Sequence, residues 1–116
     1  MIIIAGTIDF ADQANRDGAV AAVVPLQQAT RVGEAGCLGY SFAADTGVAN
    51  RVQVYELWAD EASLAAHFEH ANFQATKNAM GAFERSGPSA VTKYRCDRTS
   101  PVYDADRRPR ADFFDE

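Results

Sequence analysis

The sequence predicts an α+β fold, and three observations lead to this class. Four short segments are rich in β-branched and aromatic residues or alternate apolar with polar side chains, as β-strands do. Apolar residues at helical spacing occupy the stretch after the first of these segments and the stretch before the last. The chain has 116 residues, 47% of them hydrophobic and 23% charged, which suffices for one compact domain and is too few for two.

The first strand and the first helix are expected within the first third of the chain. Residues 2–10 are apolar at both odd and even positions, which is typical of a strand buried on both faces. From residues 12–31 the pattern is helical, although Pro25 should remove a hydrogen bond and kink the helix. Gly33 and Gly36 are expected to end it. One stripe of this helix is apolar and contains Ala19, Val20, Val23 and Leu26.

Two further strands follow and are expected to form a hairpin. Residues 37–44 read as the second strand, with Leu38, Tyr40 and Phe42 on one face. Residues 45–50 form a turn region, and residues 51–58 form the third strand. Alternation then places the following side chains of the third strand on a common face: Val52, Val54, Glu56 and Trp58.

The second helical region and the last strand complete the domain. Asp60 is a good N-cap for a helix whose buried stripe contains Leu64, His67, Phe68 and Ala71. A further helical segment, residues 72–83, turns Phe73, Met80 and Phe83 inward. Gly87 and Pro88 end that segment, and residues 89–97 read as the fourth strand.

The order strand, helix, strand, strand, helix, strand is the ferredoxin-like arrangement, an antiparallel sheet with helices on one face. Its usual strand order places the second and fourth strands at opposite edges, so Cys37 and Cys96 should be too far apart to form a disulfide. The strands carry apolar residues on both faces, and the face without helices needs a partner. We therefore expect a homodimer.

Residues 1–98 are predicted to form the domain, and residues 99–116 a charged tail. Most of the tail should be solvated, while its aromatic residues offer contacts to a partner subunit: Tyr103, Phe113 and Phe114. A net charge of −5 repels phosphate backbones and argues against a nucleic-acid binder. The apolar start of the chain is too short for a signal peptide or a membrane span. We therefore expect a cytoplasmic protein that binds neither nucleic acid nor membrane.

The common cofactor and catalytic signatures are absent. There is no P-loop, no GxGxxG, no GxSxG and no zinc-ligand spacing, so neither a cofactor nor a metal is expected. His67 and His70 are three residues apart, a spacing that can suit a metal, but the helical stripe turns only His67 inward. Cys37 has no evident partner base, which favours a buried inert thiol over a nucleophile.

The remaining candidates form a group that strand parity and helical spacing direct toward the space between sheet and helices. An aromatic-lined cavity with one histidine and a few polar groups suits a planar, oxygenated ring compound. The alternative is a plain core in which Trp58 and Phe73 only pack and His67 only satisfies its hydrogen bonds. The members of the group are Tyr40, Tyr55, Glu56, Trp58, His67, Phe73 and Arg95.

Two motifs resemble the antibiotic biosynthesis monooxygenase family. Glu34–Tyr40, EAGCLGY, is similar to that family's E-x-G-C-x-x-Y segment. Tyr55–His67, YELWADEASLAAH, resembles its Y-E-x-W-x-(D/S)-x-x-x-(L/F)-x-x-H core, and Phe73 follows where the family often has a His-Phe pair. The resemblance covers residues 2–96, and Asn72 departs from it by replacing the second histidine of the H-x-x-x-x-H-F version.

The resemblance implies a dimeric α+β barrel of two ferredoxin-like subunits. It also implies an activity, because some members are quinol or anthrone monooxygenases that need no metal, flavin or haem. The expected partners are then a small aromatic substrate and O₂. His67 is the candidate for proton handling and Trp58 for shaping the reaction pocket, so these two are the expected catalytic residues. The expected substrate-binding residues are Tyr40, Asn50, Tyr55, Phe73 and Arg95, with Asn50 and Arg95 as polar donors.

Other functions on the same scaffold stay open. Haem-degrading relatives resemble one another by having an asparagine in the first strand. They also have a haem-ligating histidine where this chain has Lys77. The first strand here contains no asparagine, so haem degradation is disfavoured. An isomerase and a non-catalytic small-molecule-binding or stress-response dimer are the alternatives that fold alone does not separate. Glu56 has a structural alternative too, as a residue that holds a neighbouring strand or the dimer.

Overall fold

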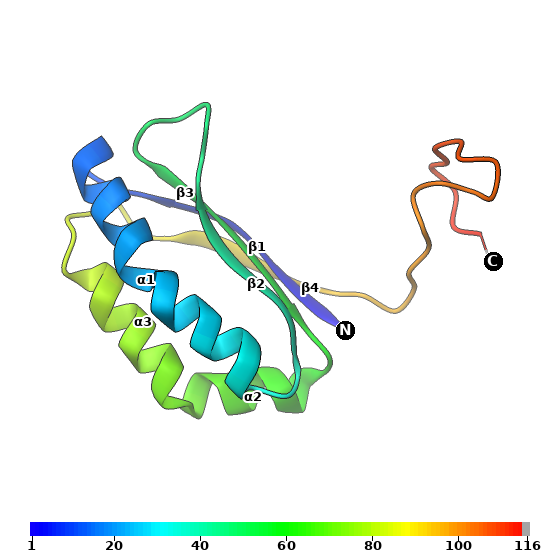
Figure 1. Cartoon of the computed structure of the whole chain (residues 1–116), viewed down its shortest axis with the longest axis horizontal. Coiled ribbons are helices and arrows are strands. Elements are labelled where there is room, and N and C mark those ends of the chain that lie inside the picture. The colour runs from blue at the N-terminus through cyan, green and yellow to red at the C-terminus, as the bar shows by residue number, and fades with distance from the viewer. Residues whose placement is uncertain (115–116) are drawn as a thin grey trace.

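The computed structural model describes residues 1–114 and confirms the α+β class and the ferredoxin-like element order (Figure 1). Each predicted strand is present, with bounds that differ by at most two residues from those expected. The second helical region is divided into two helices at His70, which ends one and caps the next. The elements are β1 (Ile2–Asp9), α1 (Gln13–Gly33), β2 (Cys37–Ala44), β3 (Arg51–Trp58), α2 (Glu61–Glu69), α3 (Ala71–Gly81) and β4 (Ala90–Arg95).

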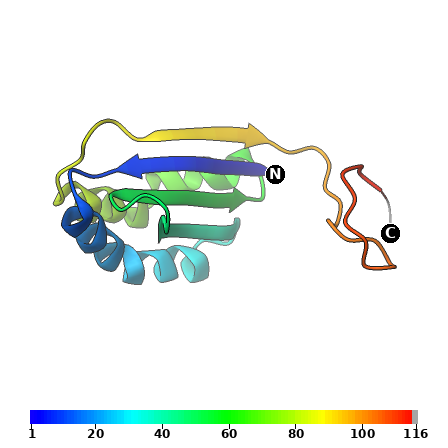
Figure 2. The same cartoon turned by 90° about the horizontal axis from the view of Figure 1, so that it is seen from above.

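The four strands form one antiparallel sheet in the order β2-β3-β1-β4. As predicted, β2 and β4 are the two edges, and both Cys37 and Cys96 are free thiols. The helices all lie on one face of the sheet, and the other face is uncovered (Figures 1 and 2). Within residues 1–114, no helix is both long enough and apolar enough to cross a bilayer.

A β-bulge near the start of β2 corrects one prediction. Cys37 pairs with Trp58 and Gly39 pairs with Leu57, so Leu38 is an extra residue between two successive pairs. The bulge breaks the alternation, and Leu38 is exposed instead of sharing the buried face with Tyr40. The prediction for Leu38 is therefore wrong, because period-two reasoning does not see an inserted residue.

Helix α1 begins at Asp12, whose side chain accepts a hydrogen bond from the backbone N–H of Asn15 at 2.8 Å. It continues through Pro25 to Gly33. The buried stripe differs from the one expected, because Val20 and Leu26 are only partly buried. The buried positions are Arg16, Ala19, Val23 and Thr30.

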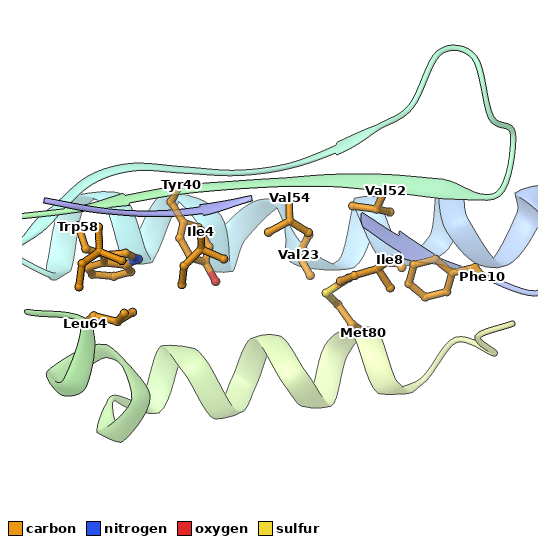
Figure 3. Packing of buried hydrophobic residues seen from close by; sticks show 12 residues of the cluster. Ile4, Ile8, Phe10, Val23, Tyr40, Val52, Val54, Trp58, Leu64 and Met80 are labelled. Atoms are coloured by element: carbon orange, nitrogen blue, oxygen red, sulfur yellow. The ribbon is translucent and has the colours of Figure 1, made fainter. Parts of the chain in front are cut away.

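The core lies between the helix-facing side of the sheet and the helices (Figure 3). The sheet contributes the inward positions predicted for β3, together with inward residues of β1 and β2, while α3 packs mainly on α1. In Figure 3 the side chains of Tyr40 and Trp58 point from the sheet toward the layer of α2 and α3. The cavity described below lies between this side of the sheet and the helices α2 and α3.

After β4 the chain leaves the domain and folds back on itself (Figure 2). Tyr103 pairs with Pro109, and the hydroxyl of Ser100 donates to the carbonyl of Phe114 at 2.9 Å. The tail projects from the domain, and the Cα radius of gyration is 16.1 Å, against roughly 13 Å for a compact chain of this length. Val102, Tyr103 and Phe113 are exposed. Residues 115–116 of the predicted tail lie outside the described residues.

Candidate functional site

A cavity of about 330 Å³ lies between the sheet and the helices α2 and α3. Strand alternation explains its inner wall, since Ile4, Ile8 and Val54 are inward positions of β1 and β3. Aromatic side chains and a few polar groups form the rest of the wall. The other lining residues include Tyr40, Phe42, Glu56, His67, Phe68, Phe73, Thr76, Lys77, Met80, Arg85 and Val91.

His67 lies where α2 meets the cavity. The helix is started by Asp60, whose side chain accepts a hydrogen bond from the N–H of Ser63 at 2.7 Å, and this start directs His67 inward. The histidine is 1% exposed. Its ring centroid lies 4.5 Å from that of Trp58, 5.5 Å from that of Tyr40 and 5.4 Å from that of Phe73. The structure therefore brings three of the predicted site residues together around the imidazole of the fourth, His67.

Glu34 is the partner of His67 and was not predicted as a site residue. Its Oε1 lies 2.7 Å from Nδ1 of His67, and its Oε2 accepts a hydrogen bond from Nδ2 of Asn72 at 3.1 Å. The Glu34 side chain is 7% exposed, so this is a largely buried carboxylate. A carboxylate accepts hydrogen bonds, so the contact is satisfied by the imidazole tautomer that carries its hydrogen on Nδ1. Nε2 carries no hydrogen in this tautomer, and the His67 side chain lines the cavity.

The only sequence signal for Glu34 is its place in the motif around Cys37. It is the residue after α1 and it lies 33 positions before His67 in the chain, so no local periodicity connects the two. Asn72, which departs from the two-histidine version of the motif, holds the second oxygen of the same carboxylate. Asn72 thus gives Glu34 an amide donor at the position where the two-histidine version of the motif has an imidazole.

Glu56 and Trp58 form a second buried pair on β3. The indole Nε1 of Trp58 donates a hydrogen bond to Oε1 of Glu56 at 2.9 Å, and Trp58 itself is fully buried. Burial raises the pKa of Glu56 above its usual value, although the bond from Trp58 and the nearby His67 act in the opposite direction. This carboxyl group fixes the indole that forms one face of the His67 environment.

The hydroxyl of Tyr40 is turned toward α3. It is hydrogen-bonded to Thr76, whose own hydroxyl donates to the carbonyl of Asn72 at 2.8 Å. Burial, followed by the negative charge of Glu56, raises the pKa of Tyr40 well above its usual range. Tyr40 therefore stays a neutral phenol, and the ionised form needed for a base is strongly disfavoured.

Three of the predicted site residues lie elsewhere. Tyr55 is 45% exposed on the sheet face that has no helices. The side chain of Asn50 donates to the carbonyl of Phe10 at 2.8 Å and so secures the start of β3 at the other end of the sheet. Arg95 lines a separate outer pocket on the β4 side. Phe73 does line the cavity, next to Lys77, whose ammonium lies 5.4 Å from the centroid of the Phe73 ring.

The other candidates from the sequence have ordinary environments. Burial raises the pKa of the Cys37 thiol, which lowers the thiolate fraction and agrees with an inert side chain. His70 is largely outside the cavity, where its Nδ1 accepts a hydrogen bond from the N–H of Asn72 at 3.0 Å. Among the side chains of residues 1–114, no group of three or more His, Cys, Asp or Glu is placed to hold a metal. The expectation of a cofactor-free site remains a prediction.

The fold and this cavity define a class: a small ferredoxin-like α+β protein with an aromatic pocket containing a carboxylate-paired histidine. The sequence model of the antibiotic biosynthesis monooxygenase family matches residues 1–79. The match covers more than half of the chain, and the protein belongs to that family. A search of curated proteins finds no match.

Solved structures show the same fold at low sequence identity. A protein from Deinococcus radiodurans, provisionally named an antibiotic biosynthesis monooxygenase, is 20% identical, with a TM-score of 0.76 over 90% of this chain and 100% of its own. A Caulobacter crescentus protein with the same provisional name is 22% identical, with a TM-score of 0.75 over 84% and 90%. A Bacteroides thetaiotaomicron protein of unknown function, described as a possible oxidoreductase, is 20% identical, with a TM-score of 0.67 over 80% and 95%.

Proposed function

We propose that this protein is a cofactor-independent monooxygenase that oxidises an electron-rich phenolic, quinol or anthrone-type molecule with O₂. The observation that carries the proposal is the Glu34–His67 pair in the wall of an aromatic cavity. Such a substrate reacts with O₂ only after it loses a proton, so the protein must supply a base in a pocket that excludes water. The family membership and the fold support this choice over a plain core.

The residues have separate roles in the proposed reaction. Nε2 of His67 takes the phenolic or enolic proton, and the carboxylate of Glu34 at Nδ1 stabilises the imidazolium that forms. Phe73 lines the cavity and packs against the substrate ring, whereas Trp58 packs against the imidazole of His67 and holds it in place. Tyr40, which stays a neutral phenol, contributes its aromatic ring to the wall of the cavity beside His67.

The reaction balances without an external reductant. The substrate anion gives one electron to O₂, and the two radicals combine into a peroxide at a ring carbon that carries hydrogen. The O–O bond then breaks as that carbon loses its hydrogen, and a ketone forms. One oxygen atom stays on the carbon, and the other leaves as water with the two hydrogens lost by the substrate. All electrons come from the substrate itself.

The test is O₂ consumption with a panel of anthrones, hydroquinones and catechols, using isotopically labelled O₂ and boiled protein as the blank. One labelled oxygen atom per product molecule is expected. His67→Gln should lower kcat by roughly 10²–10⁴-fold, the usual contribution of a general base, while the melting temperature shows that the variant is folded. His70→Asn is the matched control, because asparagine also caps helices and His70 is half exposed; its activity should be unchanged.

Two outcomes would contradict the proposal. Full activity of a folded His67→Gln variant would remove His67 from the mechanism. Saturable binding of the ring compounds by the wild-type protein, with no O₂ consumed for any of them, would replace the proposal with a non-catalytic binding protein. Conversion of a substrate to an isomer without O₂ uptake would identify an isomerase instead.

A further inference from the structure

A second, outer pocket of about 580 Å³ lies next to the cavity. The two share Phe68, whose side chain lines both and is 47% exposed. Leu64 and Ile2 line the outer pocket on the side of α2 and β1. We call the cavity and the outer pocket together the trough, with the aromatic ring of Phe68 at the boundary between its inner and outer parts.

The charges of the trough are mostly positive, although the chain carries a net charge of −5. Lys77 and Arg85 line the inner part, and Lys93 and Arg95 line the outer part. None of these four side chains forms an ion pair within residues 1–114. The carboxyl groups lining the trough are Glu61, in the outer part, and Glu56, whose pKa is raised by burial.

The register of the sheet turns the two β4 cations inward. Lys93 pairs with Ile4 and Arg95 pairs with Ile2, and residues paired across antiparallel strands project from the same face. Ile2 and Ile4 are buried on the helix-facing side. Lys93 and Arg95 therefore lie on the face that is otherwise apolar, whereas the face that has no helices carries Tyr94 from the same strand.

We propose that the trough selects aromatic ligands that carry an anionic substituent such as a carboxylate. The ring occupies the aromatic inner part, and the anion meets Lys93 and Arg95 in the outer part. Within residues 1–114 these two cations form no ion pair, and in a concave and partly apolar site they attract such a group and form charge-assisted hydrogen bonds with it. As a statement about the substrate, the inference rests on the proposed function; as a statement about binding, it stands by itself.

The test compares a hydroxynaphthoate with the naphthol of the same ring system, by calorimetry under nitrogen so that no turnover interferes. The hydroxynaphthoate should bind at least roughly tenfold more tightly, as expected for a hydrogen-bonded ion pair. The preference should shrink as salt is raised. In Lys93→Gln/Arg95→Gln the preference should fall to within about twofold with naphthol affinity unchanged.

Arg107→Gln/Arg108→Gln is the matched control, because it removes the same charge from the exposed tail. It should keep the preference of the wild-type protein. Equal affinity of the wild-type protein for both compounds, no binding of either, or an undiminished preference in the Lys93→Gln/Arg95→Gln variant would each overturn the inference. The last result would indicate that these cations only protect an edge strand from pairing with other chains. Failure of the proposed function appears separately, as absent O₂ uptake with the binding preference intact.

Discussion

At the scale of single residues, the site combines groups that the sequence pattern identifies with groups that it does not. Helical spacing and strand alternation predict that His67, Trp58 and Tyr40 turn inward, and all three are buried. The burial of Glu34 and Arg16 is not predicted in this way, because polar residues are assigned to the surface by default. Each is held by partners distant in sequence. Arg16 donates to the carbonyls of Asp45, Val48 and Arg51, and Glu34 contacts His67.

The buried carboxyl of Glu56 gives a prediction about pH. Because burial raises its folded-state pKa above the value of about 4.5 in the unfolded chain, the folded protein binds the proton more tightly than the unfolded chain does. The free energy of unfolding should therefore fall as pH rises from about 4.5 through the folded-state pKa. Glu56→Gln removes this titration and still offers an oxygen to Nε1 of Trp58.

We expect the variant to gain stability relative to the wild-type protein as pH increases, in urea unfolding experiments from pH about 4 to about 8. The groups that face Glu56 are Trp58, His67 and Glu34, and all three remain in the variant. Their contribution to stability is then largely common to the two proteins. A stability difference independent of pH would show that Glu56 has an ordinary pKa in the folded state.

At the scale of elements, the sequence predicts the strands well because their alternation is regular, and it fails where geometry depends on a neighbour. The bulge that exposes Leu38 has no local signal in CLGYSFAA. The helix after Asp60 and the further helical segment expected after it are both present, and His70 separates them as a cap, since its imidazole accepts the N–H of Asn72. The packing of α3 on α1, beside the cavity, joins segments distant in the chain and is not predictable from the α3 sequence.

The close approach of β1 and β4 gives a prediction about an element. A Cβ atom at Gly6 would overlap the carbonyl oxygen of Ala90 and lie 2.6 Å from Cα of Val91. Both contacts are backbone, so the two strands would have to separate. Gly6→Ala should lower the free energy of unfolding by about 1–3 kcal/mol, the usual effect of overpacking.

Gly33→Ala is the matched control, because nothing lies within 4 Å of an added Cβ at this helix end. It should change stability by no more than about 1 kcal/mol, and in the stabilising direction. Urea unfolding of both variants gives the comparison. Equal stability of the two variants would mean that β4 does not pack against β1 as described. The outer wall of the trough, which β4 forms, would then be wrong as well.

At the scale of the whole molecule, the uncovered sheet face is the feature that the single chain leaves unexplained. Leu57, Ile3 and Tyr94 are paired in register across β3, β1 and β4, and they form an apolar row on that face. Tyr55 lies beside the row and is 45% exposed, and Tyr94 is 54% exposed. A sheet needs cover on an apolar face, and a second copy of the same face supplies it by two-fold symmetry. The homodimer therefore remains our proposal for the assembly.

The proposed dimer predicts that sedimentation at micromolar concentration gives twice the mass of the 12.6 kDa chain. Tyr55→Asp places a charge on the face and should raise the dimer dissociation constant by roughly tenfold or more, because a buried unpaired charge opposes association. Val32→Asp, at a 75% exposed position of α1, adds the same charge on the helix side and should leave the dimer intact. A monomeric wild-type protein, or equal effects of the two variants, would exclude this face as the interface. If Tyr55→Asp abolishes the dimer and the variant keeps the O₂-dependent activity proposed for His67, each subunit holds a complete site.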